Sequence, residues 1–243
     1  MKRYNNFLLE RLSTMAVAKK IALDLGEEID EYLGEGAYGK AYSTKSNKVL
    51  KLTSGVREFK QAYALSRNKN RTKYLINYYN VGEIVYDWSD EFDRINAGKD
   101  DYDKLRWYIL MDRVLPLNQN ESDVLSQYII SKLLKDIVRD NKKIDKETFL
   151  DGFNKYIETY TNNKTYTNNK TYIKNMATTI LYLYPHIINI ANELKLHKIY
   201  EYDFHSGNVG WNKDKTHLVF FDIGGKDDDY KRNNKKIIID EKI

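Results

Sequence analysis

The chain has 243 residues, enough for one large domain or two smaller lobes built around an apolar core. Hydrophobic residues make up 42% of it and charged residues 31%, which indicates a soluble globular protein and excludes a mostly disordered one. The net charge of +5 is the small difference between 40 basic and 35 acidic side chains, so we expect no nucleic-acid partner. The chain has no cysteine, which excludes disulfides, thiolate nucleophiles and cysteine metal sites.

The N-terminal region is predicted to form a helical extension. One helical stripe within residues 3–25 is apolar: Leu8, Leu12, Met15 and Ala16. Such a stripe fits a partner or a membrane surface, but we expect it to pack on its own domain. Glu10 and Arg11 interrupt the apolar run that a signal peptide would need, and no run reaches transmembrane length. We therefore expect a cytoplasmic protein that does not contact membranes.

A glycine-rich segment follows, in which Gly34, Gly36 and Gly39 have the spacing G-x-G-x-x-G. Dinucleotide-binding folds use the same spacing, but there a helix begins at the glycines. In this chain alternating residues lie on both sides of the glycines, and Val49-Leu50-Lys51-Leu52 reads as a further strand. The pattern therefore predicts a glycine-rich hairpin that covers phosphates.

Lys51 lies between apolar residues, where burying an unpaired ammonium would be costly. One explanation is that it pairs with nucleotide phosphates and with a glutamate on the next helix. The alternative is a lysine on the solvent face of an edge strand. The helix predicted from about residue 56 to 67 offers one carboxylate, Glu58, as the partner. This pairing requires the helix to begin almost directly after the strand.

The next region predicts the junction between two lobes. Residues 74–86 read as a turn and a strand, residues 87–103 as an acidic solvent loop, and residues 107–111 as an apolar strand. The pattern is rich in strands before residues 112–116 and helical after them. This short segment is therefore the predicted hinge.

Three helices are predicted after the hinge, at about residues 121–139, 146–160 and 176–196. A hexapeptide repeat at residues 159–172 is expected to form an exposed loop or to extend a helix end. Pro185 lies inside the last helical run, where it predicts a kink or a join between two segments.

The most informative segment lies near the end of the sequence. Asp203 and Asn208 are separated by four residues, and Asp222-x-Gly follows a short apolar run. In kinases the first aspartate orients the attacking hydroxyl, while the asparagine and the second aspartate hold Mg²⁺. Such oxygen ligands suit Mg²⁺ because it is a hard cation. A loop, an edge strand and a turn would explain the same residues without any function.

Taken in chain order, these motifs resemble the protein-kinase-like superfamily over about residues 30–225. The resemblance implies a two-lobed α+β fold, with a five-stranded antiparallel sheet in a strand-rich N-lobe and a truncated helical C-lobe. It implies an extension at residues 1–27, a nucleotide-binding N-lobe at residues 28–113 and a C-lobe at residues 114–243. The implied cofactors are ATP and Mg²⁺.

The resemblance also assigns roles in nucleotide binding. Three glycines would cover the phosphates: Gly34, Gly36 and Gly39. Lys51 would hold the α- and β-phosphates, with Glu58 as its partner. Met111, Asp112 and Val114 would line the adenine pocket through backbone groups.

In the catalytic segment, the resemblance implies that Asp203 is the catalytic aspartate and that Asn208 and Asp222 bind Mg²⁺. His205 would either contact the γ-phosphate in place of a lysine or bond the loop backbone. With His205 the loop reads Asp-x-His-x-Gly-Asn, which looks more like small-molecule phosphotransferases of the aminoglycoside and choline kinase types and like atypical microbial and phage kinases. Glu201-Tyr202 stands where protein kinases usually carry His-Arg.

Few residues follow Asp222, and no Ala-Pro-Glu motif appears among them. We therefore expect the docking surface for a substrate to come from another part of the chain or from a protein partner, unless the substrate is small. The predicted activity is transfer of the γ-phosphoryl group to a serine or threonine of a protein. The alternatives are a small-molecule phosphotransferase and a nucleotide-binding pseudokinase that acts through a partner. An unrelated helical adaptor is a third possibility.

Overall fold

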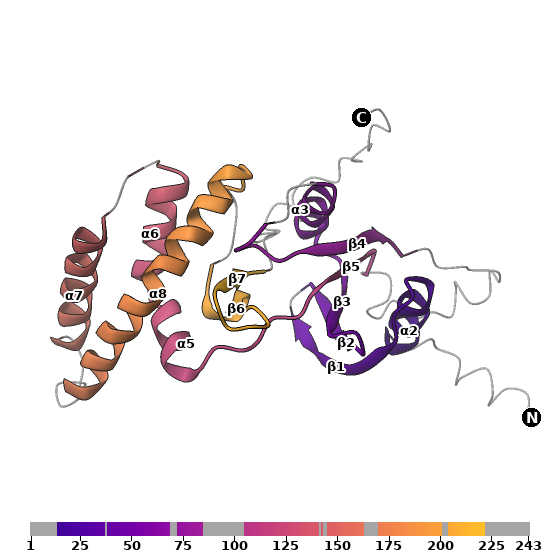
Figure 1. The fold of residues 1–243 in the computed structure, drawn as a ribbon, viewed down its shortest axis with the longest axis horizontal. Helices are drawn as coiled ribbons and strands as arrows, with labels where there is room; N and C mark the ends of the chain where they lie inside the picture. Colours follow the sequence, from indigo (N-terminus) through magenta and orange to yellow (C-terminus); the bar gives the residue numbers. More distant parts are fainter. Residues whose placement is uncertain are drawn as a thin grey trace, which may run out of the picture.

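The computed structural model describes residues 14–36, 38–68, 72–84, 105–140, 142, 145–162, 170–200 and 204–221. The fold class is α+β, as predicted: a five-stranded antiparallel sheet occupies one end of the molecule and a group of helices the other (Figure 1). A short hairpin lies between the two ends (Figure 1).

The sheet has the order β1-β2-β3-β5-β4, and every neighbouring pair is antiparallel. Its strands are β1 (Ile29–Gly36), β2 (Gly39–Thr44), β3 (Lys48–Thr53), β4 (Tyr78–Glu83) and β5 (Trp107–Asp112). Gly36 pairs with Gly39, so the glycine segment turns directly from one strand into the next. The predicted hairpin is confirmed, and the dinucleotide-type helix at the glycines does not form.

Each face of the sheet packs against a different partner because side chains alternate along a strand. On one face, α2 (Thr14–Asp24) packs through Val17 and Ala18 against Leu50 and Leu52 of β3. The part of the N-terminal helix that the structure describes therefore packs on its own domain, as expected. On the other face, α3 (Val56–Ser66) packs through Ala62.

Several predicted segments lie wholly or partly outside the described residues. They include all of residues 3–13, the acidic segment 87–103, the centre of the hexapeptide repeat and everything after Phe221. Within the described part, β4 ends at Glu83 and β5 begins at Trp107, close to the predicted strands.

The first helix after the hinge differs from the prediction. Instead of one helix over residues 121–139, two form: α5 (Gln119–Leu125) and α6 (Tyr128–Val138). A capping box begins α5, in which the Asn118 side chain accepts from the Glu121 amide and the Glu121 carboxylate accepts from the Asn118 amide. At the break, the side-chain amide of Gln127 donates to the Asp123 carbonyl, satisfying an acceptor at the end of α5.

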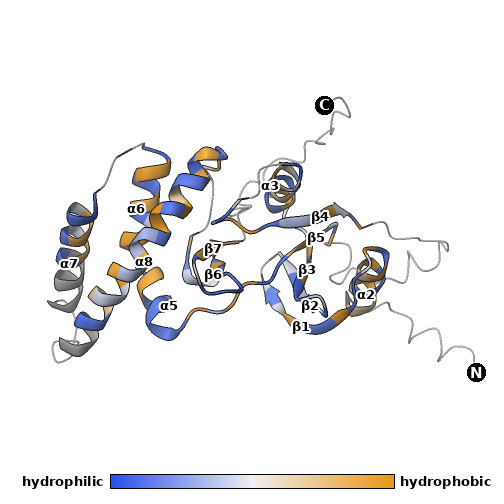
Figure 2. Cartoon of the chain, viewed as in Figure 1, coloured by the Kyte–Doolittle hydropathy of each residue, from blue (hydrophilic) through white to orange (hydrophobic). Residues whose placement is uncertain are grey.

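The other two predicted helices form as α7 (Lys146–Asn162) and α8 (Lys170–Leu196). Helix α8 continues through Pro185, so this proline marks no join between helices. The main apolar core lies where α5, α6 and α7 meet α8, and Figure 2 shows apolar and polar residues alternating along these helices. Its fully buried α8 side chains are Ile180, Leu183, Ile187, Ile190, Ala191 and Leu194. No described helix is both long and apolar enough to cross a membrane.

A hairpin made of β6 (Val209–Trp211) and β7 (Leu218–Phe220) joins the two ends. Leu115 and Trp211 exchange two main-chain hydrogen bonds of 2.8 Å, and the Ile76 amide donates to the Phe220 carbonyl at 3.0 Å. Glu193 of α8 accepts from the amides of Lys73, Tyr74 and Leu75 at 2.7, 2.8 and 3.0 Å. The hinge and the segment before β4 are thus both fixed to the helical end.

Candidate functional site

Lys51 lies in the interior of the sheet, because β3 is bordered by β2 on one side and β5 on the other. The edge-strand alternative is therefore wrong. Its Nζ lies 2.5 Å from Glu58 Oε1, and the two side chains are only 16% and 8% exposed. Removing either partner of a charged pair that is this little exposed strongly destabilises the folded protein, because the other charge stays buried without its partner.

Helix α3 begins early enough to bring Glu58 to Lys51. Gly55 is the N-cap residue, and only Ser54 and Gly55 separate β3 from α3. The buried hydroxyl of Thr53 lies 3.0 Å from Glu58 Oε2 and accepts from the Gly55 amide at 3.0 Å. Both carboxylate oxygens of Glu58 therefore have partners from β3.

The structure requires glycine at only two of the three glycine positions of the hairpin. Gly34 has a φ of 144°, a conformation that residues with a Cβ rarely adopt. A Cβ on Gly39 would lie 2.1 Å from the Leu52 carbonyl oxygen, so close packing on β3 requires this glycine. A Cβ on Gly36 would meet no described atom within 4 Å. The described fold therefore gives no steric reason for glycine at position 36.

The residues predicted to line the adenine pocket lie in two different surroundings. Met111 is buried in the cluster that also contains Val49 and Ile109, with Val114 packed at its border. The Asp112 side chain instead accepts hydrogen bonds from Asn77 Nδ2 at 2.8 Å and from the Tyr79 hydroxyl at 2.5 Å. Among the described residues, the main-chain amide of Val114 has no hydrogen-bond partner.

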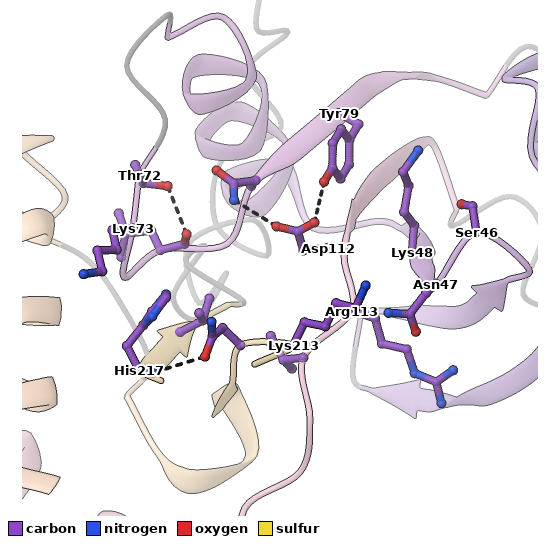
Figure 3. Close-up of a pocket in the computed structure, with 15 residues that line it drawn as sticks. Ser46, Asn47, Lys48, Thr72, Lys73, Tyr79, Asp112, Arg113, Lys213 and His217 are labelled. Carbon is purple, nitrogen blue, oxygen red and sulfur yellow. Dashed lines mark hydrogen bonds between the residues drawn. The ribbon is translucent and has the colours of Figure 1, made fainter. Parts of the chain in front are cut away.

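The Asp112 carboxylate lies at a cavity of about 570 Å³ behind the hinge (Figure 3), and no pattern in the sequence predicts this cavity. Its walls come from the sheet end, the hinge and the β6–β7 hairpin, including Lys48, Arg113 and His217. Lys51, Glu58 and the hairpin glycines are not among its lining residues. Two of its cations are already paired, Lys48 with Glu27 at 2.7 Å and Arg113 with Glu31 at 3.2 Å.

The described part of the catalytic segment is a single 3₁₀ turn, η2 (Ser206–Asn208). His205 caps it, because its Nδ1 accepts from the Gly207 amide at 3.0 Å. Of the two readings of His205, the bond to the loop backbone is therefore the one that the structure contains. A Cβ on Gly207 would lie 2.8 Å from this ring, which explains the glycine there.

Asn208 is buried, and its carbonyl accepts from the Phe221 amide at 2.9 Å. Phe221, the residue directly before Asp222 in the sequence, therefore lies next to the main chain of Asn208. Asp203 and Asp222 themselves lie outside the described residues, so their predicted roles stay predictions. Within the described ranges no three His, Asp or Glu side chains are arranged to hold a metal ion.

His186 and His217 have no ligand spacing in the sequence, which predicts packing or surface roles. His186 of α8 packs edge-on against Trp211 with ring centroids 5.3 Å apart, and His217 packs against Tyr74 at the same separation. Burial lowers the pKa of His186, and the nearby His217 adds to this. Burial also lowers the pKa of His217, with a further contribution from the charge of Lys73. Both rings belong to the joint between the hairpin and the helical end.

No protein-family model matches the chain, and no curated protein matches it either. Among solved structures, it is similar to the PknI kinase domain of Mycobacterium tuberculosis, with a TM-score of 0.35 and 12% sequence identity. The match covers 83% of this chain and 60% of that domain, so the chain spans less than two thirds of its length. Because the TM-score is low, we base the proposed function on this chain's own contacts and motifs.

Proposed function

We propose that this protein is a compact ATP- and Mg²⁺-dependent kinase that transfers the γ-phosphoryl group to a hydroxyl. The observation that carries the proposal is the Lys51–Glu58 ion pair, which is nearly buried in the sheet that the glycine hairpin begins. A lysine oriented in this way is suited to hold phosphates, because Glu58 fixes the direction of its positively charged ammonium.

The described residues fit the three parts of Mg-ATP. For the base, partly buried Ala41, Val114 and Phe221 border one apolar cluster, and the Val114 amide can donate. For the phosphates, the hairpin offers a glycine whose Cβ position is open, at Gly36, and the sheet offers Lys51. For the metal, Asn208 would supply a side-chain oxygen, with Asp222 beyond the described end of the chain.

In this proposal each group acts by position and charge. Mg-ATP, when bound, supplies the phosphoryl group and a metal ion that neutralises its charge. Lys51, held by Glu58, orients the α- and β-phosphates, and Asp203 orients the acceptor hydroxyl and takes its proton. Because His205 Nδ1 accepts a hydrogen bond from the loop backbone, the phosphate contact in this proposal uses the Nε2 side of the ring. Its bond to the Gly207 amide and a phosphate contact are therefore compatible.

We favour serine or threonine of a protein as the acceptor, as the sequence predicts. Incubation of the purified chain with γ-labelled ATP, Mg²⁺ and a cell lysate distinguishes the alternatives. Label in protein supports a protein kinase, and label in metabolites supports a small-molecule phosphotransferase. Thermal stabilisation by Mg-ATP without transfer would select the pseudokinase, and the absence of any stabilisation would contradict nucleotide binding altogether.

Variants of two lysines on the same strand provide a matched control. Lys51→Met should lower transfer by about 100-fold or more, since it removes a cation aimed at the phosphates. Lys48→Met removes a cation that pairs with Glu27 and lines the cavity behind the hinge. The rate of phosphoryl transfer of this variant should stay within about threefold of wild type. Asp203→Ala and Asp222→Asn should abolish transfer. Equal rates in the wild type and in these three site variants would exclude the enzyme.

A further inference from the structure

Thr53, the last residue of β3, is fully buried, and its hydroxyl has three neighbours. It accepts from the Gly55 amide at 3.0 Å. Its proton can be donated to Glu58 Oε2 at 3.0 Å or to the Tyr38 carbonyl at 3.2 Å. A hydroxyl has one proton, and a carboxylate is the stronger acceptor, so the bond to Glu58 is favoured.

The next residue extends these contacts to the tip of the glycine hairpin. The Ser54 amide donates to the Tyr38 carbonyl at 2.7 Å, and the Ser54 hydroxyl lies 3.1 Å from the same oxygen. Tyr38 lies in the turn between Gly36 and Gly39. Thr53 and Ser54 therefore contact the hairpin turn on one side and Glu58 on the other.

The connection from β3 to α3 leaves little room for independent movement. Lys51 and Glu58 are seven residues apart. Thr53, at the end of β3, hydrogen-bonds through its hydroxyl both to the Gly55 amide in the connection and to Glu58 in α3. In kinases the placement of the helix that carries this glutamate controls activity. Here the helix start is bonded to the strand that carries the lysine.

We propose that Thr53 is a positioning residue: its hydroxyl holds Glu58 in the orientation that pairs with Lys51, while the main-chain amide of the next residue fixes the glycine hairpin over the same site. The proposal rests on the proposed function for its effect on catalysis. Its structural content, the orientation of Lys51 by way of Glu58, is measurable without turnover.

The test compares Thr53→Val with Thr53→Ser. Valine keeps nearly the same shape but removes both the donor to Glu58 and the acceptor for the Gly55 amide, whereas serine keeps the hydroxyl. The first readout is the rate at which acetic anhydride labels the Lys51 amine in nucleotide-free protein, measured by peptide mass spectrometry. We expect Thr53→Val to raise this rate several-fold and Thr53→Ser to stay close to wild type.

A double-mutant cycle decides whether Thr53 acts through Glu58. In a Glu58→Gln background the ion pair is already lost, so Thr53→Val should have no further effect on Lys51 labelling. Equal effects of Thr53→Val in both backgrounds would overturn the proposal. So would a Thr53→Val protein that loses only thermal stability while Lys51 labelling is unchanged, because Thr53 would then only cap the helix.

Catalysis provides a second readout. Thr53→Val should lower kcat by about tenfold and change the KM for ATP much less, because the Lys51 charge remains but is no longer well oriented. Thr53→Ser should restore kcat. Ser54→Ala is the matched control, since the Ser54 amide still donates to Tyr38 and its kcat should stay within about threefold of wild type.

If Thr53→Val does not fold, proton NMR of the wild type takes its place. A buried hydroxyl that donates to a carboxylate exchanges slowly and gives its own resonance, which should shift in Glu58→Gln. No such resonance, or one that does not shift, overturns the proposal. Altered Lys51 labelling without any phosphate transfer would keep the positioning role and contradict only the kinase function.

Discussion

The sheet end of the molecule and the helical end are stabilised in different ways. In the sheet, β1, β2 and β3 pair with their sequence neighbours, and the central ion pair spans seven residues. At the helical end, apolar side chains from four helices form one cluster, and two carboxylates bind partners far away in the sequence. Glu121 accepts from the Trp211 indole 90 residues away, and Glu193 accepts from the Tyr74 amide 119 residues away. Substitutions should therefore act through backbone packing in the sheet and through apolar burial in the helices.

The largest effect is expected in the apolar cluster. Ile187 is fully buried on α8, so Ile187→Ala should lower the free energy of unfolding by about 4 kcal/mol, from lost burial and the cavity left behind. Leu181→Ala on the same helix is the control, because Leu181 is 40% exposed, and it should cost less than about 1 kcal/mol. Urea unfolding measures both. Similar losses would mean that α8 is not packed as described.

The sheet should respond instead to a single added methyl group. Gly39→Ala would place a Cβ against the Leu52 carbonyl and should cost about 3 kcal/mol, because backbone on both sides has to move. Gly36 is the last residue of β1, and a Cβ at this position would meet no described atom within 4 Å. Gly36→Ala should therefore change the free energy of unfolding by less than about 1 kcal/mol. If Gly36→Ala weakens Mg-ATP binding while its stability is kept, it supports a backbone that approaches phosphates. A Gly39→Ala protein as stable as wild type would contradict the close approach of β2 to β3.

The joint between the two ends depends on a charged acceptor. Glu193 Oε1 accepts from the Lys73 amide, and Oε2 accepts from the Tyr74 and Leu75 amides. In Glu193→Gln one of these oxygens becomes an amide group that cannot accept, so we expect a loss of about 2 kcal/mol in unfolding free energy. Glu147→Gln, at an exposed position on α7, should change it by less than about 0.5 kcal/mol. Equal effects of the two variants would show that the Glu193 carboxylate does not hold this joint.

This contrast also explains what the sequence could predict. The hairpin, the strand lysine and its partner Glu58 were predictable, because antiparallel neighbours and a short strand–helix connection place nearby residues together. The periodic helix around Ile187 was predictable for a similar local reason. The break between α5 and α6 was missed because apolar spacing continues across Ser126 and Gln127, although Asn118 and Glu121 already have the spacing of a capping box.

Other contacts depend on the final packing and have no local signal. The three amides at Glu193 and the indole at Glu121 come together only when segments 90 or more residues apart meet. The cavity behind the hinge has the same origin, since its described lining residues come from four separated stretches of the chain. The spacing of Asp203, Asn208 and Asp222 predicts a kinase-type site, and this stays a prediction because Asp203 and Asp222 lie outside the described residues.

The smallest effect is expected from pH, at the hairpin joint that contains His186 and His217. The pKa of each is lowered from its ordinary value of 6.5, mainly by burial. The unfolded chain therefore takes up protons first as the pH falls below that value, and stability should be lost from about pH 6.5 down to the lowered pKa of the folded state. The groups around His217 act in opposite directions: the charge of Lys73 lowers its pKa, while a hydrogen bond with the Lys73 backbone and the charges of Glu193 and Asp214 raise it. Urea unfolding at about pH 7.5 and about pH 5.5 samples both sides of pH 6.5. The lower of these pH values stays above the range in which Asp145 titrates, because hydrogen bonds from Thr148 lower its pKa from 3.8.

His217→Asn and His186→Gln should each reduce the pH dependence of unfolding, and the double variant should nearly remove it within this window. The effect is modest because both rings are only partly buried and water screens part of the charge. If the double variant keeps the full pH dependence, other groups are responsible, and the hairpin joint does not need neutral histidines. If it removes the dependence while Mg-ATP still stabilises the protein, neither histidine is needed for nucleotide binding, although His217 lines the same cavity as Asp112 and Val114.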